Sequence, residues 1–171
     1  MVHATIFSGH EGQLRPGAVF YLTLFAGCTL KRPTVARQIA ATKQSRGDAP
    51  VQRRKPFFLT IFGGAEIEFP TLAEEYLDLV HMLDAGSVTI EDWDQAMARS
   101  AAEDGVVASL TLFGAFDECA LPSETREIDT IALQRHLGNI SEDASHVLQC
   151  AIGQADAERR ATVRRAALVA A

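Results

Sequence analysis

Acidic side chains are concentrated between residues 71 and 104, where they could do one of two kinds of chemistry. A pair of carboxylates can act as general acid and general base, and a cluster can hold a divalent cation. The acids of this stretch, opposed by a single Arg99, are Glu74, Glu75, Asp78, Asp84, Glu91, Asp92, Asp94, Glu103 and Asp104. They do not form the D-x-D-x-D-G pattern of a calcium loop, and helical spacing places them on an outer face. We therefore interpret them as a solvated surface and predict no catalytic, cofactor-binding or metal site.

The remaining residues with catalytic potential form no known motif. The histidines are scattered, at His3, His10, His81, His136 and His146. The pair His10-Glu11 lacks the second histidine of a zinc-protease signature. The sequence contains no glycine-rich phosphate loop and no G-x-S-x-G nucleophile elbow. We expect a protein that is not an enzyme and needs no cofactor, while a hydrolase or ligand-binding enzyme with a cleft site stays open as an alternative.

Cysteine content and hydropathy bear on the compartment. Cys28, Cys119 and Cys150 are odd in number and isolated, which is typical of a reducing compartment. The chain opens without a signal-peptide pattern, and its longest uncharged run, residues 16–30, is too short to span a bilayer. We expect a cytoplasmic protein without a transmembrane segment, and peripheral membrane contact stays open.

Half of the chain's 16 basic residues lie in one segment, and three explanations for it remain open. These residues are Lys31, Arg32, Arg37, Lys43, Arg46, Arg53, Arg54 and Lys55. They could form a solvated loop, contact an acidic neighbour in this chain or another subunit, or bind nucleic acid or anionic lipid. No aromatic residue lies between Lys31 and Pro56 to stack on bases, and the net charge of −6 disfavours nucleic acid.

Separated charges of opposite sign suggest an interaction surface. The interaction candidates are Arg53, Arg54, Lys55, Glu91, Asp92, Asp94, Arg164 and Arg165. Contact between the acidic and the basic groups of two copies would steer assembly and weaken as salt rises. We expect a homo-oligomer or an acidic protein partner.

One phrase is repeated four times along the chain. Its copies are Thr5-Ile6-Phe7-Ser8-Gly9, Thr23-Leu24-Phe25-Ala26-Gly27, Thr60-Ile61-Phe62-Gly63-Gly64 and Thr111-Leu112-Phe113-Gly114-Ala115. Alternation of apolar side chains predicts that each copy is a strand, and that the four phenylalanines align in a column of equivalent sites on neighbouring strands. A proline follows each copy, at Pro16, Pro33, Pro70 and Pro122, and indicates a repeated corner of the strand.

The repeat predicts the fold class and the domains. We expect an α+β protein with a small stacked-β, solenoid- or roll-like body of four repeats, and an ordinary β-sandwich is the alternative. The body would occupy residues 1–122, interrupted by a basic loop at 34–56 and an acidic helical hairpin at 71–104. Apolar residues at helical spacing predict the hairpin. The caps Ser123 and Ser141 predict C-terminal helices over 123–171.

Two stretches resemble known families. Residues 79–94, a Leu-rich helix followed by a Gly turn, Val-Thr-Ile and the acid-acid-aromatic triplet Glu91-Asp92-Trp93, are similar to the SHOCT-type helical hairpin. The repeated Thr-Ile/Leu-Phe-Gly-Gly phrase with its proline resembles the β-domain of LiaF-type cell-wall-active antibiotic response proteins. The resemblance implies a bacterial, non-catalytic interaction module. From the separated charges and the open ends of a short β-stack we expect an interaction or scaffold protein that self-associates. Its alternative is an accessory regulator of envelope-stress signalling or transcription.

Overall fold

The computed structural model describes residues 2–5, 10–13, 20–25, 27–45, 57–102, 108–111, 113–114 and 116–170. The strands are short: β1 Val2–Thr5, β2 His10–Gln13, β3 Phe20–Thr23, β4 Cys28–Lys31, β5 Phe57–Thr60, β6 Ala65–Glu68, β7 Ala108–Thr111 and β8 Phe116–Ala120. The helices are longer: α1 Val35–Ser45, α2 Leu72–Asp84, α3 Ile90–Ala102, α4 Glu124–His136, α5 Glu142–Gln149 and α6 Asp156–Ala170.

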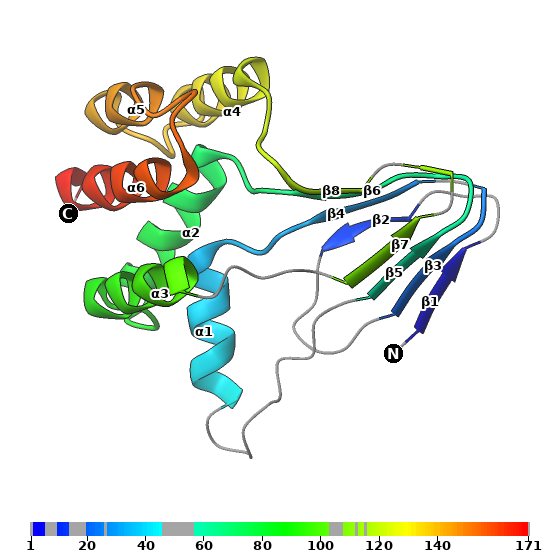
Figure 1. Ribbon diagram of the computed structural model, residues 1–171. Coiled ribbons are helices and arrows are strands. Elements are labelled where there is room, and N and C mark those ends of the chain that lie inside the picture. Colours follow the sequence, from blue (N-terminus) through cyan, green and yellow to red (C-terminus); the bar gives the residue numbers. More distant parts are fainter. Residues whose placement is uncertain are drawn as a thin grey trace. The chain divides into compact units, whose positions relative to one another are not determined.

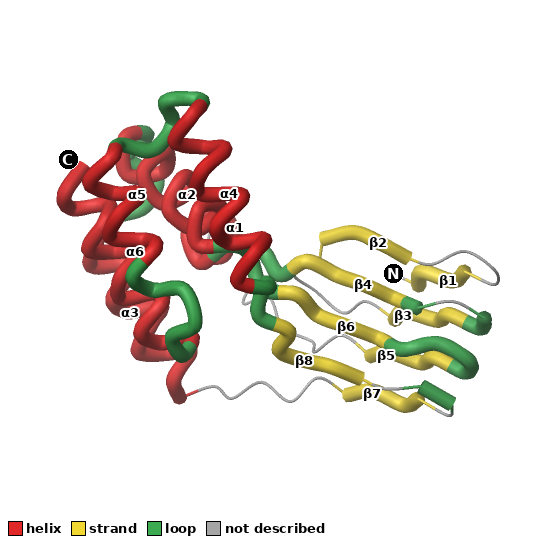
Figure 2. Tube along the Cα trace, turned by 90° about the horizontal axis from the view of Figure 1, so that it is seen from above, coloured by secondary structure: helices red, strands yellow, loops and turns green. Residues whose placement is uncertain are grey.

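Strands next to each other in the sequence join different sheets. The odd-numbered strands form one parallel sheet in the order β1-β3-β5-β7, and the even-numbered strands form a second in the order β2-β4-β6-β8. Figure 1 shows the first series side by side, and Figure 2 shows the second. Equivalent residues of the repeat are register partners, so Thr5, Thr23, Thr60 and Thr111 form one row across the first sheet.

The repeated phrase is a corner between two strands, which corrects the prediction that it is itself a strand. Each copy of the phrase that includes described residues has its Thr as the last residue of a strand, and Phe25, Phe62 and Phe113 lie in the bends that follow. Successive corners are joined by backbone hydrogen bonds, from Phe62 N–H to Leu24 O and from Phe113 N–H to Ile61 O, both 2.9 Å. The tiny residues fit this role, because a Cβ on Gly114 would lie 2.3 Å from the carbonyl oxygen of Gly63.

The three phenylalanines do align, but they are not buried. The rings of Phe25 and Phe62, and those of Phe62 and Phe113, stack with centroids 5.2 Å apart. More than half of each side chain is exposed. The expected column is therefore present for these three residues, and its rings lie in exposed bends rather than within strands. Phe7 lies outside the described residues.

The proline after each later copy precedes a helix rather than a corner of the strand. Pro33, Pro70 and Pro122 are each followed by a Thr or Ser and then by α1, α2 and α4. Proline disfavours helical conformation in the residue before it, and a hydroxyl directly after it can cap the new helix. The side chains of Thr34, Thr71 and Ser123 each accept a backbone N–H from the residue three positions later. Pro16 lies outside the described residues.

The predicted fold class is wrong, because the chain is mostly helical and a stacked-β body does not hold its described core. The strands are four or five residues long, whereas the helices have 8–15 residues. The described apolar core cluster lies in the helices and the turns between them, with Leu79, Trp93, Ile131 and Leu148 fully buried. Among the described side chains of the strand unit, the buried hydrophobic ones are Leu30, Ile67 and Phe69. The helices therefore carry most of the packing that is described.

Two compact units divide the chain. One comprises 1–33, 45–69 and 103–121 and contains the strands. The other comprises 34–44, 70–102 and 122–171 and contains the helices. The helical hairpin expected at 71–104 is present as α2 and α3, and the turn between them contains Gly86 with φ 64°. The segment 34–56 is not simply a loop, because α1 occupies 35–45; residues 46–56 lie outside the described residues.

Candidate functional site

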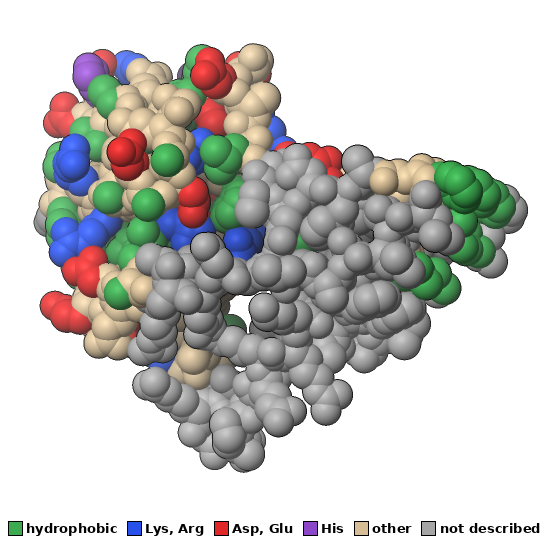
Figure 3. Space-filling view, in the orientation of Figure 1, with side chains coloured by type: hydrophobic (Ala, Val, Ile, Leu, Met, Phe, Trp, Pro, Cys, Tyr) green, Lys and Arg blue, Asp and Glu red, His purple; other side chains and the backbone are tan. Residues whose placement is uncertain are grey.

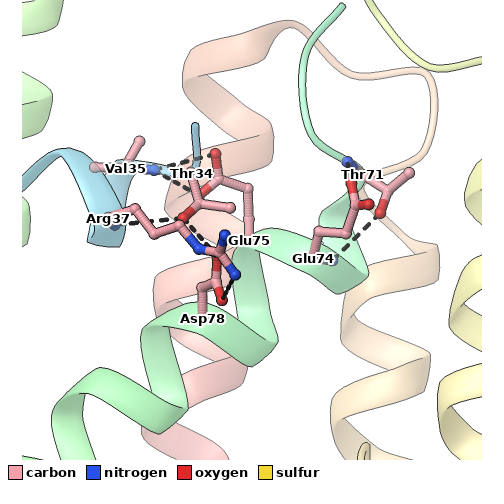
Figure 4. A network of polar contacts seen from close by, with 7 residues as sticks. All are labelled: Thr34, Val35, Arg37, Thr71, Glu74, Glu75 and Asp78. Atoms are coloured by element: carbon pink, nitrogen blue, oxygen red, sulfur yellow. Dashed lines mark hydrogen bonds and ion pairs between the residues drawn. The ribbon is translucent and has the colours of Figure 1, made fainter. Parts of the chain in front are cut away.

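A cluster of polar side chains joins the start of α1 to α2 (Figure 4). The Glu75 carboxylate accepts the backbone N–H of Val35 at 3.0 Å, so a residue of α2 satisfies the first amide of α1. Thr34 donates its hydroxyl to Asp78 at 2.8 Å. Asp78 also forms a bidentate ion pair with Arg37, at 2.6 and 3.0 Å. These contacts fix the first turn of α1 onto one face of α2.

Burial changes the protonation of Glu75. Its side chain lies almost wholly out of solvent, and loss of hydration raises its pKa to about 7. The hydrogen bond from Val35 N–H and the charge of Arg160 oppose this rise, whereas the charges of Asp156 and Asp78 add to it. A carboxyl with a pKa near neutrality has the chemistry of a general acid or base. The groups around it, however, are a helix amide and neighbouring charges within the helical unit, which indicates a structural role.

A second buried carboxylate, on α4, performs the same task for α2. Glu127 is fully buried, and it accepts the backbone N–H of Leu72, the first residue of α2, at 2.8 Å. Its other oxygen pairs with Arg159 of α6, which is also buried. An uncompensated charge at this depth would be costly. Arg159 and the Leu72 amide compensate the Glu127 carboxylate, and the carboxylate in turn accepts from both buried donors. Neither Glu127 nor Arg159 stood out in the sequence, although Glu75 and Glu127 both lie five residues after a proline.

The acidic hairpin is not a uniformly solvated face, because two acids of α3, like Glu75 and Asp78 of α2, hold other helices. Asp92 of α3 pairs with Lys43 of α1 at 2.5 Å, and Asp94 of α3 pairs with Arg164 of α6 at 2.8 Å. Of the explanations for the basic segment, contact with acids of the same chain is therefore realised for Arg37 and Lys43. The pKa of Asp92 falls to about 2, chiefly because of the hydrogen bond from Lys43 and then that from Thr89 N–H.

The predicted interaction candidates are not brought together as one surface. Asp92, Asp94 and Arg164 are engaged within the helical unit, while Glu91 and Arg165 are exposed on α3 and α6. The candidates Arg53, Arg54 and Lys55 lie outside the described residues. In Figure 3, positive and negative side chains intermingle over the helices rather than separating into two fields. Charge complementarity is thus used largely for internal docking among the residues described.

The exposed phenylalanine stack is the surface that sequence reasoning missed. Phe25, Phe62 and Phe113 have exposed fractions of 54%, 54% and 71%, and their ring planes are within 3° and 7° of parallel. Figure 3 shows hydrophobic side chains gathered at one end of the strand unit. Exposing a row of aromatic rings to water is unfavourable, and such a row is typical of an interaction surface. The repeated phrase gave the signal, but its strand interpretation hid the exposure.

No group of three or more His, Cys, Asp or Glu side chains is placed in the described part of the chain to hold a metal ion. None of the described helices combines the length and apolar composition that crossing a bilayer requires.

Comparison with known proteins gives no assignment. No protein-family model, no curated protein and no solved structure matches the chain. The resemblance to SHOCT-type hairpins and LiaF-type β-domains therefore stays a prediction.

Proposed function

We propose that this chain is a non-enzymatic interaction or scaffold protein that associates with copies of itself. The observation that carries the proposal is the row of three exposed, stacked rings at the corners of the strand unit, Phe25, Phe62 and Phe113. Stacking holds the rings in one orientation before any partner arrives, so little conformational entropy is lost when they are covered. A pre-ordered apolar row is suited to protein contact.

The assignment of the buried carboxylates supports the same proposal. Glu75 and Glu127 have the burial expected of catalytic acids, but each accepts the first amide of a neighbouring helix. Their chemistry is accounted for by helix docking. The proposal also places the protein in the bacterial cytoplasm, in keeping with its isolated cysteines and its resemblance to LiaF-type and SHOCT-type modules.

The test is the mass of the protein in solution with and without the aromatic row. Sedimentation velocity over a concentration series should give species larger than 18.5 kDa for the natural chain. The variant Phe25→Ser/Phe62→Ser/Phe113→Ser should be monomeric at the same concentrations. The matched control is Leu133→Ser/Leu137→Ser, which removes two exposed apolar side chains, one in α4 and one directly after it, and should leave association unchanged.

Circular dichroism of each variant separates loss of contact from loss of fold. A natural chain that is monomeric at every concentration would overturn self-association. Association that survives in a folded triple variant would show that the aromatic row is not the contact.

A further inference from the structure

We propose that the partner at the strand unit is a second copy of this chain, whose β1 edge pairs in parallel with the β7 edge of the first. The inference deepens the proposed self-association and rests on it. It specifies which two surfaces meet, in which direction and in which register.

The first sheet has two different edges, and each is the complement of the other. β1 pairs on one side with β3, and β7 pairs on one side with β5, so each has an outer edge without a strand in the described sheet. All three pairings within the sheet are parallel and in the same register. The edge that β5 presents to β7 is thus of the same kind as the edge that β7 presents outward. A second copy would place its Thr5 beside Thr111 and its His3 beside Ser109.

The two edge strands lack the charged and proline residues that often block pairing. Natural edge strands are commonly blunted by Lys, by Pro or by inward-pointing charges. β1 reads Val-His-Ala-Thr and β7 reads Ala-Ser-Leu-Thr, with no Lys, Arg, Asp, Glu or Pro in either strand. Unprotected edges of this kind are templates for a further strand.

The aromatic row ends at the same edge. Phe113, in the corner after β7, is 71% exposed, whereas Phe25 and Phe62 are 54% exposed. Each corner in the series covers a face of the ring before it, as the stacking of Phe113 on Phe62 shows. A further layer outside β7 would cover the open face of Phe113 in the same way, which adds apolar burial to the strand pairing.

The second sheet makes the contact sensitive to salt. Its register row contains Glu11, Thr29, Glu66 and Asp117, so continuation would set Glu11 of the added copy beside Asp117. Like charges at neighbouring positions repel. The pairing of β6 with β8 also has a register shift, between Glu66 and Glu68 of β6, which interrupts regular pairing. The first sheet therefore carries the contact, and screening should strengthen it. A contact between opposite charges would weaken under the same conditions.

A parallel edge-to-edge contact is head-to-tail. Each copy uses one surface to receive and a different surface to donate, so both surfaces remain available at the ends of a chain of copies. Two variants blocked at opposite edges therefore still share one intact junction. This property allows a complementation test that a symmetric dimer would fail.

The test uses Ser109→Lys and His3→Lys, which place a Lys at equivalent register positions on the two edges. Each variant alone should sediment as an 18.5 kDa monomer, and an equimolar mixture should give a species of twice that mass. The natural chain should form larger species, and raising NaCl from 50 to about 500 mM should increase their fraction. The matched control is Ala132→Lys, which adds the same charge on an exposed position of α4 and should behave as the natural chain.

The outcomes distinguish this inference from the broader proposal. Either variant associating alone, or a folded mixture that stays monomeric, would overturn pairing between β1 and β7. If the natural chain then still associates, self-association holds through another surface. A natural chain that is monomeric at both salt concentrations would overturn both proposals.

Discussion

Glu75 and Glu127 occupy the same position, the fourth residue of α2 and of α4. Each accepts the first backbone N–H of the helix that follows the preceding copy of the repeat. The amides are those of Val35 in α1 and Leu72 in α2. The first amides of a helix have no partner within it, and burial makes an unsatisfied amide costly. The repeat therefore extends beyond the strands, since a helix of one repeat completes the helix of the repeat before it.

The raised pKa of Glu75 predicts a pH dependence of stability. Its folded pKa of about 7 exceeds the ordinary value of 4.5, so the folded state binds this proton more tightly than the unfolded state. The free energy of unfolding should then fall as pH rises from about 4.5 to 7, by on the order of 3 kcal/mol. Urea unfolding at pH 5, 6, 7 and 8 measures this fall.

The matched variant is Glu75→Gln, which keeps an oxygen acceptor for Val35 N–H and cannot ionise. Its unfolding free energy should be nearly constant over the same range. An equal fall in the natural chain and in Glu75→Gln would assign the dependence to another group.

The buried ion pair predicts a large cost for removing one partner. Arg159→Met leaves the Glu127 carboxylate buried without its counter-charge and should cost about 3–5 kcal/mol of unfolding free energy. The double variant Glu127→Gln/Arg159→Met removes both charges and keeps an acceptor for Leu72 N–H, so it should recover most of the loss. The exposed pair Arg135–Glu142 is the control, and Arg135→Met should cost less than about 1 kcal/mol.

Thermal or urea unfolding of the four proteins gives the comparison. A double variant no more stable than Arg159→Met would mean that the charges themselves, rather than their balance, hold α4, α6 and the start of α2 together.

Close approach of two corners predicts that any side chain at Gly114 destabilises the fold. The Cβ of Gly114→Ala would lie 2.3 Å from the Gly63 carbonyl oxygen, a backbone atom that cannot move without shifting the corner. The substitution should cost about 1–3 kcal/mol. Gly27→Ala is the matched control, because its Cβ would lie 3.4 Å from the Gly64 oxygen, which is close to ordinary contact. Equal melting temperatures for the two variants would contradict the packing of the corners.

The pair of Asp94 with Arg164 predicts that charge reversal acts within one chain. Arg164→Glu should lower the unfolding free energy by up to about 1 kcal/mol, because the pair is partly exposed. The swap Asp94→Arg/Arg164→Glu should restore part of this loss, and neither variant should change the mass in solution. A lower oligomer mass for Arg164→Glu would return this pair to the role of a contact between copies.

Sequence reasoning located the repeat because a Thr-Ile/Leu-Phe phrase seldom recurs by chance. It misplaced the phrase because alternation of apolar residues continues through a bend as readily as through a strand. The exposure of Phe62 could not be inferred, since a large apolar side chain is more often buried.

The buried carboxylates were also missed for a physical reason. A Glu in a polar helix is ordinarily solvated, and only its distance from the preceding proline was informative. Pro70 and Pro122 are each followed five residues later by Glu75 and Glu127, and Pro33 is followed at the same distance by Gln38. Aligning the chain on its prolines would have exposed this pattern. The partners Val35 and Leu72 depend on helix docking, which no local sequence window contains.

The constant register of the strands shows that the chain tolerates insertions of very different sizes. Residues 14–19, 32–56 and 69–107 separate successive strand pairs, yet Thr5, Thr23, Thr60 and Thr111 remain register partners. The entropic cost of closing a loop grows slowly with its length, so a foreign domain placed after β4 or β6 adds little to the cost of pairing the strands. The repeat is thus a natural acceptor for inserted sequence, and duplication of one strand pair with its helix is a route by which such a chain could have lengthened during evolution.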